Sequence, residues 1–122
     1  YTPEILIHQF KIMTDNWQKG LDILEKLDGN EDVKDLTIIA QACYCHFKST
    51  LNHLEFVYFR DRGEKEKLPE IIRNERDLTM KLLELQKQDD RIGFESSNHY
   101  FYYCNELIEK VVCCDTLLEY FA

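Results

Sequence analysis

The chain has 122 residues, of which 44% are hydrophobic and 31% are charged, and its formal net charge at pH 7 is −8. This length suits one domain with one core, and this balance of residue types excludes an intrinsically disordered chain. The acidic excess makes nucleic acid and anionic membrane surfaces unfavourable partners, so neither is expected. Four glycines and two prolines favour helices over a many-stranded fold.

The sequence carries no pattern typical of a secretion signal or a membrane span, because no window approaches 18 consecutive apolar residues. Five cysteines include two close pairs, and the members of each pair point in different directions on a helix. We therefore expect free thiols and a soluble, cytoplasmic protein. Because the chain starts at Tyr1 rather than methionine, we expect a single helical domain over residues 1–122 that is a fragment of a longer chain.

The first predicted helix begins where Thr2 can cap it, where Pro3 suits the first helical position and where Glu4 meets the positive end of the helix dipole. It extends over about 26 residues and ends at residues 28–30. Gly20 lies on its apolar stripe and predicts the close approach of a neighbouring helix, with simple tolerance of glycine as the alternative. The stripe comprises Leu6, Phe10, Met13, Trp17, Gly20, Leu24 and Leu27.

The second predicted helix runs from about residue 32 to residue 62, and Gly63 is its natural stop. Residues 60–67 alternate in charge and predict an exposed corner. The third helix begins near Pro69 and ends at about Gln88, and the short link makes it antiparallel to the second. The apolar stripes of these two helices comprise Leu36, Ala40, Cys43, Phe47, Thr50, Leu54 and Val57, followed by Ile71, Ile72, Leu78, Leu82, Leu83 and Leu85.

Helical periodicity fails from residue 89 to residue 103 and returns in a last helix from about Asn105 to Tyr120. The sequence therefore predicts an all-α fold, an antiparallel helical bundle of about four helices with one irregular aromatic-rich segment before the last helix. Residues 92–122 contain five acidic side chains and one basic side chain. The outer face of the last helix therefore suits a basic partner or the remainder of a parent protein, with plain solvation as the alternative. The stripe of this helix comprises Leu107, Val111, Cys114, Leu118 and Phe121, flanked by Ile108 and Leu117.

No familiar catalytic or metal-binding pattern is complete in the sequence. The chain lacks the paired Glu-x-x-His motifs of di-iron bundles, a phosphate-binding glycine loop and a nucleophile elbow. Structural zinc usually needs paired ligands on turns, whereas the cysteines and histidines of the second helix lie in mid-helix. We therefore predict no catalytic residue, no metal site and no cofactor. The weaker candidates for a metal or catalytic site are Glu4 with His8, Glu95 with His99, His99 with Cys104, and the group Cys43, Cys45, His46 and His53.

The irregular segment from Arg91 to Tyr103 carries the candidate contact site. Aromatic faces stack on sugar rings while amide, carboxylate and guanidinium groups bind hydroxyls, and the same mixture is typical of protein interfaces. The alternative is a cap over the end of the bundle, with Phe94 and Phe101 filling the core. The residues predicted to contact a ligand or another domain are Arg91, Glu95, Asn98, His99, Tyr100 and Tyr102.

Residues 91–103, together with Glu106–Cys113, resemble the C-terminal helical region of large, mostly uncharacterised bacterial proteins similar to glycoside hydrolases. Residues 17–21 and 46–52 look like parts of the same region. The chain departs from that pattern at Cys104 and Asn105, where Thr-Pro is expected. The resemblance implies that the acid and base carboxylates lie in an upstream barrel domain and that this chain supports that domain or borders its pocket.

The first functional hypothesis is therefore a helical accessory domain of a larger carbohydrate-active protein, not catalytic by itself, whose partners are the remainder of the parent polypeptide and a carbohydrate. The alternative is a self-contained helical module for protein interaction or homodimerisation. A small metal-dependent enzyme ranks third. Exposed aromatic side chains clustered at one end would favour the accessory domain, and an exposed apolar stripe along a helix would favour the interaction module. Inward-converging histidines and cysteines would favour the enzyme.

Overall fold

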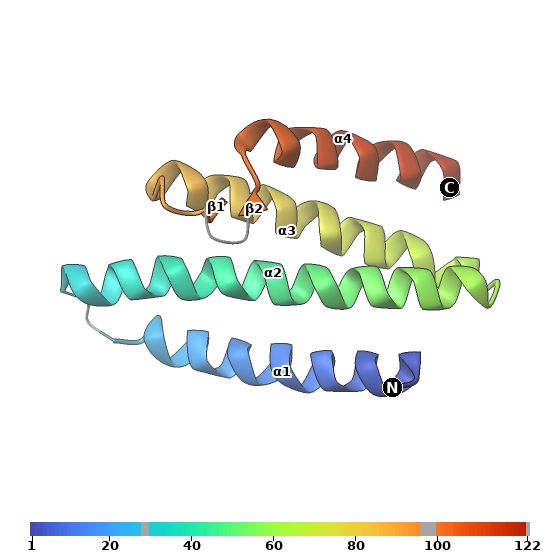
Figure 1. Cartoon of the computed structure of the whole chain (residues 1–122), viewed down its shortest axis with the longest axis horizontal. Coiled ribbons are helices and arrows are strands. Elements are labelled where there is room, and N and C mark those ends of the chain that lie inside the picture. The colour runs from blue at the N-terminus through green and yellow to red at the C-terminus, as the bar shows by residue number, and fades with distance from the viewer. Residues whose placement is uncertain (28–29, 96–99, 122) are drawn as a thin grey trace.

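The computed structural model describes residues 1–27, 30–95 and 100–121. Figure 1 shows four helices side by side, each running antiparallel to the one before it. Each helix packs on its neighbours in the sequence, α1 on α2, α2 on α3 and α3 on α4. The all-α antiparallel bundle that the sequence predicts is therefore confirmed. The described helices are α1 (Pro3–Leu24), α2 (Glu31–Asp61), α3 (Leu68–Gln88) and α4 (Cys104–Phe121).

The first helix begins as predicted but is shorter at its C-terminal end. Thr2 is extended and precedes Pro3, although its side chain makes no capping hydrogen bond. The helix ends at Leu24 rather than near residue 28, and Leu27 beyond it is half-exposed. Gly20 does not mark a close approach, because a Cβ atom placed there meets nothing within 4 Å. The buried positions of α1 are Thr14 and Leu21, so the helix is rotated relative to the predicted stripe.

The second helix lies between α1 and α3, and its buried positions are divided between those two sides. On the α1 side, the indole of Trp17 packs edge-on against Phe47 and donates a 2.8 Å hydrogen bond to the carbonyl of Ala40. Leu36 and Val57, which belong to the predicted stripe, are instead exposed. A helix with two neighbours spreads its apolar contacts over two faces, which is why one stripe describes it poorly. Asn30 caps it by accepting a hydrogen bond from the Val33 amide.

The corner between α2 and α3 follows the sequence prediction. Gly63 ends the helix with a φ of +76°, a conformation that glycine adopts without steric cost. A 3₁₀ turn over Lys65–Lys67 (η1) then leads into α3. The third helix is covered by α2 and α4. It buries three leucines of the predicted stripe, leaves Leu78 of that stripe partly buried, and also buries several polar side chains. The buried residues of α3 are Leu68, Ile72, Glu75, Thr79, Leu82, Leu83, Leu85 and Gln86.

Two apolar clusters form the core along α3, one toward each end of the array. The first joins Ala42 and Cys45 of α2 to leucines of α3 and to Leu107 of α4. The second joins Leu68 and Ile72 to Cys114 of α4. The polar residue Glu75 lies on α3 between the two clusters, and this position defines the site described below.

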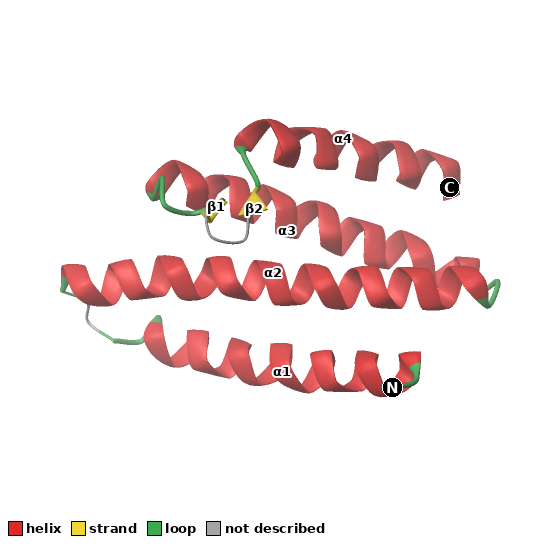
Figure 2. Ribbon diagram, viewed as in Figure 1, coloured by secondary structure: helices red, strands yellow, loops and turns green. Residues whose placement is uncertain are grey.

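The segment before α4 contains a short hairpin rather than fully irregular chain. Strand β1 (Phe94–Glu95) pairs antiparallel with β2 (Tyr100–Phe101) at one end of the array (Figure 2). Gly93 precedes the hairpin with a φ of +90°, and its carbonyl accepts a 2.7 Å hydrogen bond from the Tyr102 amide. Among the described residues, no helix is both long and apolar enough to cross a bilayer.

Candidate functional site

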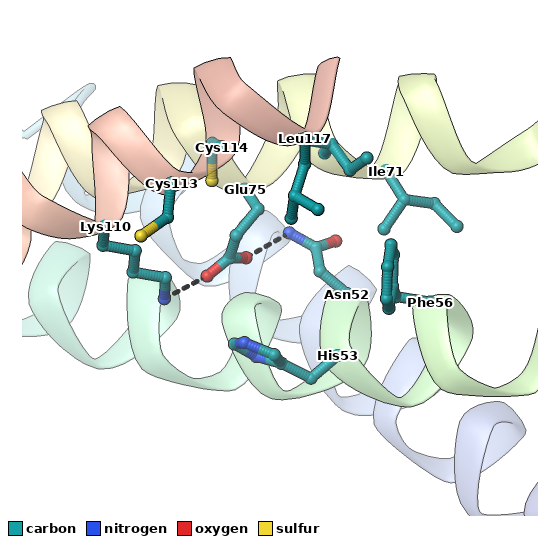
Figure 3. Close-up of a pocket in the computed structure, with 10 residues that line it drawn as sticks. Asn52, His53, Phe56, Ile71, Glu75, Lys110, Cys113, Cys114 and Leu117 are labelled. Carbon is teal, nitrogen blue, oxygen red and sulfur yellow. Dashed lines mark hydrogen bonds and ion pairs between the residues drawn. The ribbon is translucent and has the colours of Figure 1, made fainter. Parts of the chain in front are cut away.

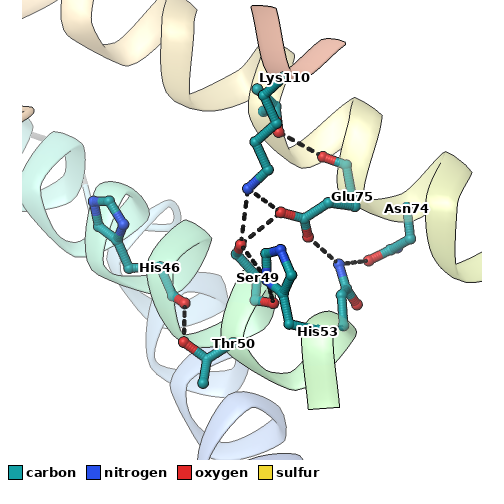
Figure 4. A network of polar contacts seen from close by, with 9 residues as sticks. His46, Ser49, Thr50, His53, Asn74, Glu75 and Lys110 are labelled. Carbon is teal, nitrogen blue, oxygen red and sulfur yellow. Dashed lines mark hydrogen bonds and ion pairs between the residues drawn. The ribbon is translucent and has the colours of Figure 1, made fainter. Parts of the chain in front are cut away.

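A network of buried polar side chains occupies the middle of the array, between the two apolar clusters. The Glu75 carboxylate of α3 is its centre, and the residue as a whole is 6% exposed. It pairs with the ammonium of Lys110 from α4, accepts a 2.5 Å hydrogen bond from the Ser49 hydroxyl and accepts a 2.7 Å hydrogen bond from the Asn52 amide. Figure 4 shows these groups converging from α2, α3 and α4. The network therefore ties three helices together at one point.

The helical spacing of α2 brings its polar residues to this network. Ser49, Asn52 and His53 are three and four residues apart, so they share one face of the helix. Asn52 also donates a 3.0 Å hydrogen bond to the side-chain oxygen of Asn74 on α3. The Nδ1 atom of His53 lies 2.8 Å from the Ser49 carbonyl of the preceding turn, which orients the ring. Lys110 donates a further 3.2 Å hydrogen bond to the Ser49 hydroxyl.

The electrostatics of the network favour the charged forms of both partners. Burial by itself would raise the pKa of the Glu75 carboxyl, but hydrogen bonds from Lys110, Ser49 and Asn52 hold it below its ordinary value of 4.5. Burial would likewise lower the pKa of Lys110, but Glu75 and Tyr102 hold it above its ordinary value of 10.5. The ion pair is therefore present over the whole neutral range.

His46 and Tyr102 border the network on the side of the hairpin. Burial lowers the pKa of His46, and the nearby charge of Lys110 lowers it further. The Lys110 ammonium lies 5.6 Å from the centre of the Tyr102 ring, within the range of a cation–π contact. The rings of His46 and Tyr102 are 6.2 Å apart. A neutral imidazole is thus favoured beside a permanent cation.

A cleft of about 190 Å³ lies beside the network, between α2 and α4, with α3 as its floor. Figure 3 shows Phe56, Ile71 and Leu117 around it, with Glu75 and Lys110 at one end. The cleft thus combines apolar walls with a fully paired charged end. Such a combination is typical of ligand pockets, in which a few polar groups fix the orientation of an apolar ligand.

The outer face of α4 is the second notable surface. Lys110, the only basic residue of this helix, is turned inward to Glu75, so the remaining charged side chains of α4 are all acidic. Ile108 and Val112 are 52% and 59% exposed, and Tyr120 is 78% exposed. Among the acidic residues of this helix, Asp115 pairs with Arg76 of α3 at 2.5 Å. The exposed acidic residues are Glu106, Glu109 and Glu119.

Arg91, the first of the predicted contact residues, is held by neighbouring acids. Its guanidinium forms several hydrogen bonds with the Asp89 carboxylate, the closest at 2.5 Å, and reaches Asp35 of α2 at 3.9 Å. The Arg91 side chain is nevertheless 64% exposed. The hydrogen bonds from Arg91 lower the pKa of Asp89 to about 2. The arginine therefore bonds to the residue that follows α3 and lies at ion-pair distance from the start of α2, while its side chain remains accessible.

Tyr102 is the other predicted contact residue whose side chain the structure describes. It is half-buried and packs against the first apolar cluster. Its carbonyl accepts a hydrogen bond from the Gln86 amide of α3. These contacts are those expected of a cap over the end of the bundle, the alternative that the sequence left open.

The remaining predicted contact residues are described only in part. Glu95 and Tyr100 are opposite one another in the hairpin ladder, which places their backbones side by side. Asn98 and His99 lie outside the described residues. The prediction that this segment contacts a ligand or another domain therefore stays a prediction.

The cysteines and histidines of α2 do not converge. Cys45 is buried, and burial raises the pKa of its thiol to about 11, whereas His53 is exposed. Across the part of the chain that the structure describes, no three His, Cys, Asp or Glu side chains are placed to share a metal ion. All five cysteines are free thiols, and Cys113 and Cys114 face opposite environments, exposed and buried.

Sequence reasoning missed the Glu75 network, although the sequence contains a signal for it. Glu75 occupies a core position of α3, three residues after Ile72 and four before Thr79, where helical periodicity requires a buried side chain. Lys110 likewise lies between Leu107 and Val111 on the apolar stripe of α4. An acid and a base at core positions of two different helices indicate a buried pair, because a buried charge needs a partner.

No protein family, curated protein or solved structure matches the chain. The resemblance to proteins similar to glycoside hydrolases consequently stays a prediction.

Proposed function

We propose that this protein is a helical interaction module that binds a basic amphipathic helix along the outer face of α4. One observation carries this proposal. The only basic residue of α4 is withdrawn into the core pair with Glu75, and its outer face therefore presents exposed apolar side chains among acidic ones. A partner with apolar residues on one face and lysines or arginines beside them is complementary to this surface in both respects.

The dimensions of α4 agree with a helical partner. A helix of 18 residues is about 27 Å long, enough for five turns of a partner lying along it. Ile108 and Val112 are four residues apart and lie one above the other, as the anchor residues of a helical interface do. Large apolar side chains more than half exposed on one helix favour a covering partner.

The accessory role that the resemblance implies is a special case of this proposal. The remainder of a longer carbohydrate-active polypeptide would then provide the basic amphipathic segment, and α4 would dock the domain against it. The homodimer alternative is less favourable, because two copies carrying −8 each would bring acidic faces together.

The test is fluorescence anisotropy with a labelled 18-residue peptide that carries leucines on one helical face and lysines on the other. We expect saturable binding, which weakens as salt is added because exposed charges are screened within about 10 Å at 0.1 M. Val112→Glu should weaken this binding at least roughly tenfold, since it replaces an apolar contact with a buried charge. Leu36→Glu is the matched control, because it also introduces a glutamate in place of a similarly exposed aliphatic side chain, on α2.

Three results would overturn the proposal. One is equal binding of a peptide of identical composition whose leucines are scattered around the helix, which would show that only charge is recognised. Another is an equal effect of Leu36→Glu and Val112→Glu. The third is a dimer in sedimentation that Val112→Glu converts to a monomer, because the natural occupant of the face would then be a second copy of this chain.

A further inference from the structure

The cleft beside Glu75 is bounded at both ends by contacts between α2 and α4. At one end Lys110 reaches across to Ser49 at 3.2 Å. At the other end the rings of Phe56 and Phe121 meet edge to face, with centres 6.4 Å apart. These two contacts bridge α2 and α4, and the cleft of about 190 Å³ lies between them. The cleft is therefore a defined feature of the packing, with side chains of three helices as its walls.

The size of the cleft restricts its occupant to a compact molecule. An apolar cavity of roughly 150 Å³ in a protein interior admits benzene, and the present cleft is slightly larger. Its walls are provided mainly by Phe56, Ile71, Ile72 and Leu117. An aromatic ring suits such walls, since it buries a large apolar area and can meet the Phe56 ring edge to face. A long acyl chain or an oligosaccharide is too large to be enclosed here.

The polar end of the cleft favours a neutral ligand that donates a hydrogen bond. The charges of Glu75 and Lys110 already compensate each other, so an ionic ligand would lose its hydration without gaining a counter-charge. The amide nitrogen of Asn52 donates to Glu75 and Asn74, which fixes the orientation of the amide. Among the described residues, the oxygen of that amide accepts no hydrogen bond, and Figure 3 shows it turned toward Phe56. It remains available to an N–H or O–H group in the cleft.

We infer that the cleft between α2 and α4 is a binding site for a compact, neutral aromatic molecule with one N–H or O–H donor, such as a phenol or an indole. The ring occupies the space among Phe56, Ile71 and Leu117, and the donor binds the side-chain oxygen of Asn52. This site is separate from the outer face of α4 and does not depend on the interaction proposed above.

Two native cysteines provide the assay. Cys113 lines the cleft, whereas Cys104 is exposed at the start of the same helix outside it. The full chain is alkylated with N-ethylmaleimide with and without phenol or indole, and each thiol is followed by peptide mass spectrometry. At a ligand concentration about ten times the dissociation constant, Cys113 should react roughly tenfold more slowly, while the rate at Cys104 stays unchanged. Toluene should protect Cys113 with an affinity roughly fivefold lower than phenol, because it lacks the donor.

Two cleft variants and a control variant decide whether the ligand protects Cys113 by occupying the cleft or by a general effect on thiol reactivity. Leu117→Trp and Ile71→Phe each fill the cleft and should abolish the protection, and circular dichroism verifies that each variant is folded. Leu36→Trp adds the same kind of bulk at an exposed residue of α2 that does not line the cleft, and it should leave the protection intact. The inference is wrong if the ligand slows Cys104 and Cys113 equally, if neither thiol is protected up to the solubility limit, or if a folded cleft-filling variant keeps full protection. None of these results bears on peptide binding at Val112, so the two proposals fail separately.

Discussion

Glu75 of α3 and Lys110 of α4 form an ion pair in the middle of the helical array, with 9% and 20% of their side chains exposed. The two paired residues are 35 positions apart in the sequence and link α3 to α4. Hydrogen bonds from Ser49 and Asn52 to Glu75 extend this link to α2. The attraction within a buried ion pair is largely offset by the loss of hydration of both charges. Removal of one partner is nevertheless strongly destabilising, because the other charge is then buried without a partner.

Removal of a single partner should therefore destabilise the protein strongly. We expect Glu75→Leu and Lys110→Met each to lower the free energy of unfolding by about 3 kcal/mol, because each leaves an unpaired charge in the core. The double variant should lose about 2 kcal/mol less than the sum of the single losses. Urea denaturation followed by circular dichroism measures all three values.

The control for this comparison of single and double variants is the exposed pair of Lys87 and Glu84, whose side chains are both 59% exposed. Lys87→Met should change the free energy of unfolding by less than about 0.5 kcal/mol. Strict additivity of Glu75→Leu and Lys110→Met would contradict the structure, because it would mean that the two side chains do not interact.

Protonation of the Glu75 carboxyl should also make the free energy of unfolding depend on pH in the acidic range. Its pKa in the folded protein is held below the ordinary value of 4.5. The stability that it contributes is therefore complete above pH 4.5 and is lost as the pH falls through the lower folded value. The urea midpoint of the native chain should fall over this acidic range, and that of Glu75→Gln should fall less steeply. Identical pH profiles for the two proteins would show that other carboxyls account for the loss.

Two glycines should respond oppositely to alanine. A Cβ atom at Gly93 would lie 2.6 Å from the Tyr102 carbonyl and closer still to the Gln86 amide, and the φ of +90° there is strained for alanine. We expect Gly93→Ala to lower the free energy of unfolding by about 2 kcal/mol or more. Gly20→Ala should raise it by about 0.5 to 1 kcal/mol, because the site is helical and open. Thermal unfolding by circular dichroism compares the two, and a gain for Gly93→Ala would mean that the turn before the hairpin is not built as described.

The contact predicted for the aromatic segment is tested with oligosaccharides. Near-ultraviolet circular dichroism of the chain is titrated with a panel of oligosaccharides, and saturable changes are expected if the segment binds a glycan. Tyr100→Ala should remove the response, whereas Tyr120→Ala, at an exposed tyrosine near the end of α4, should not. Tyr102→Ala is a poorer choice, because Tyr102 packs on the core. A flat response across the panel would leave the segment as a cap or as a contact to another polypeptide.

Much of the fold follows from local patterns in the sequence. The leucines of α3 and the stripe from Leu107 to Phe121 in α4 recur at helical spacing, and Asn30 and Gly63 delimit α2 by capping and by a positive φ. These signals are local, since the period of a helix and its end groups involve residues within about five positions of each other. The sequence therefore determined the helices, their order and their antiparallel connection.

The tertiary structure alone decided which side chains meet. Ser49, Glu75 and Lys110 are 26 and 35 residues apart, and no spacing rule relates them. Their contact depends on the relative rotation and axial position of three helices, which are set by packing of the two apolar clusters on either side. Gly20 shows the same limit, because its stripe was correct in period but wrong in rotation. Periodicity fixes the spacing of residues along one helix, whereas only the packing of neighbouring helices fixes the direction in which each face points.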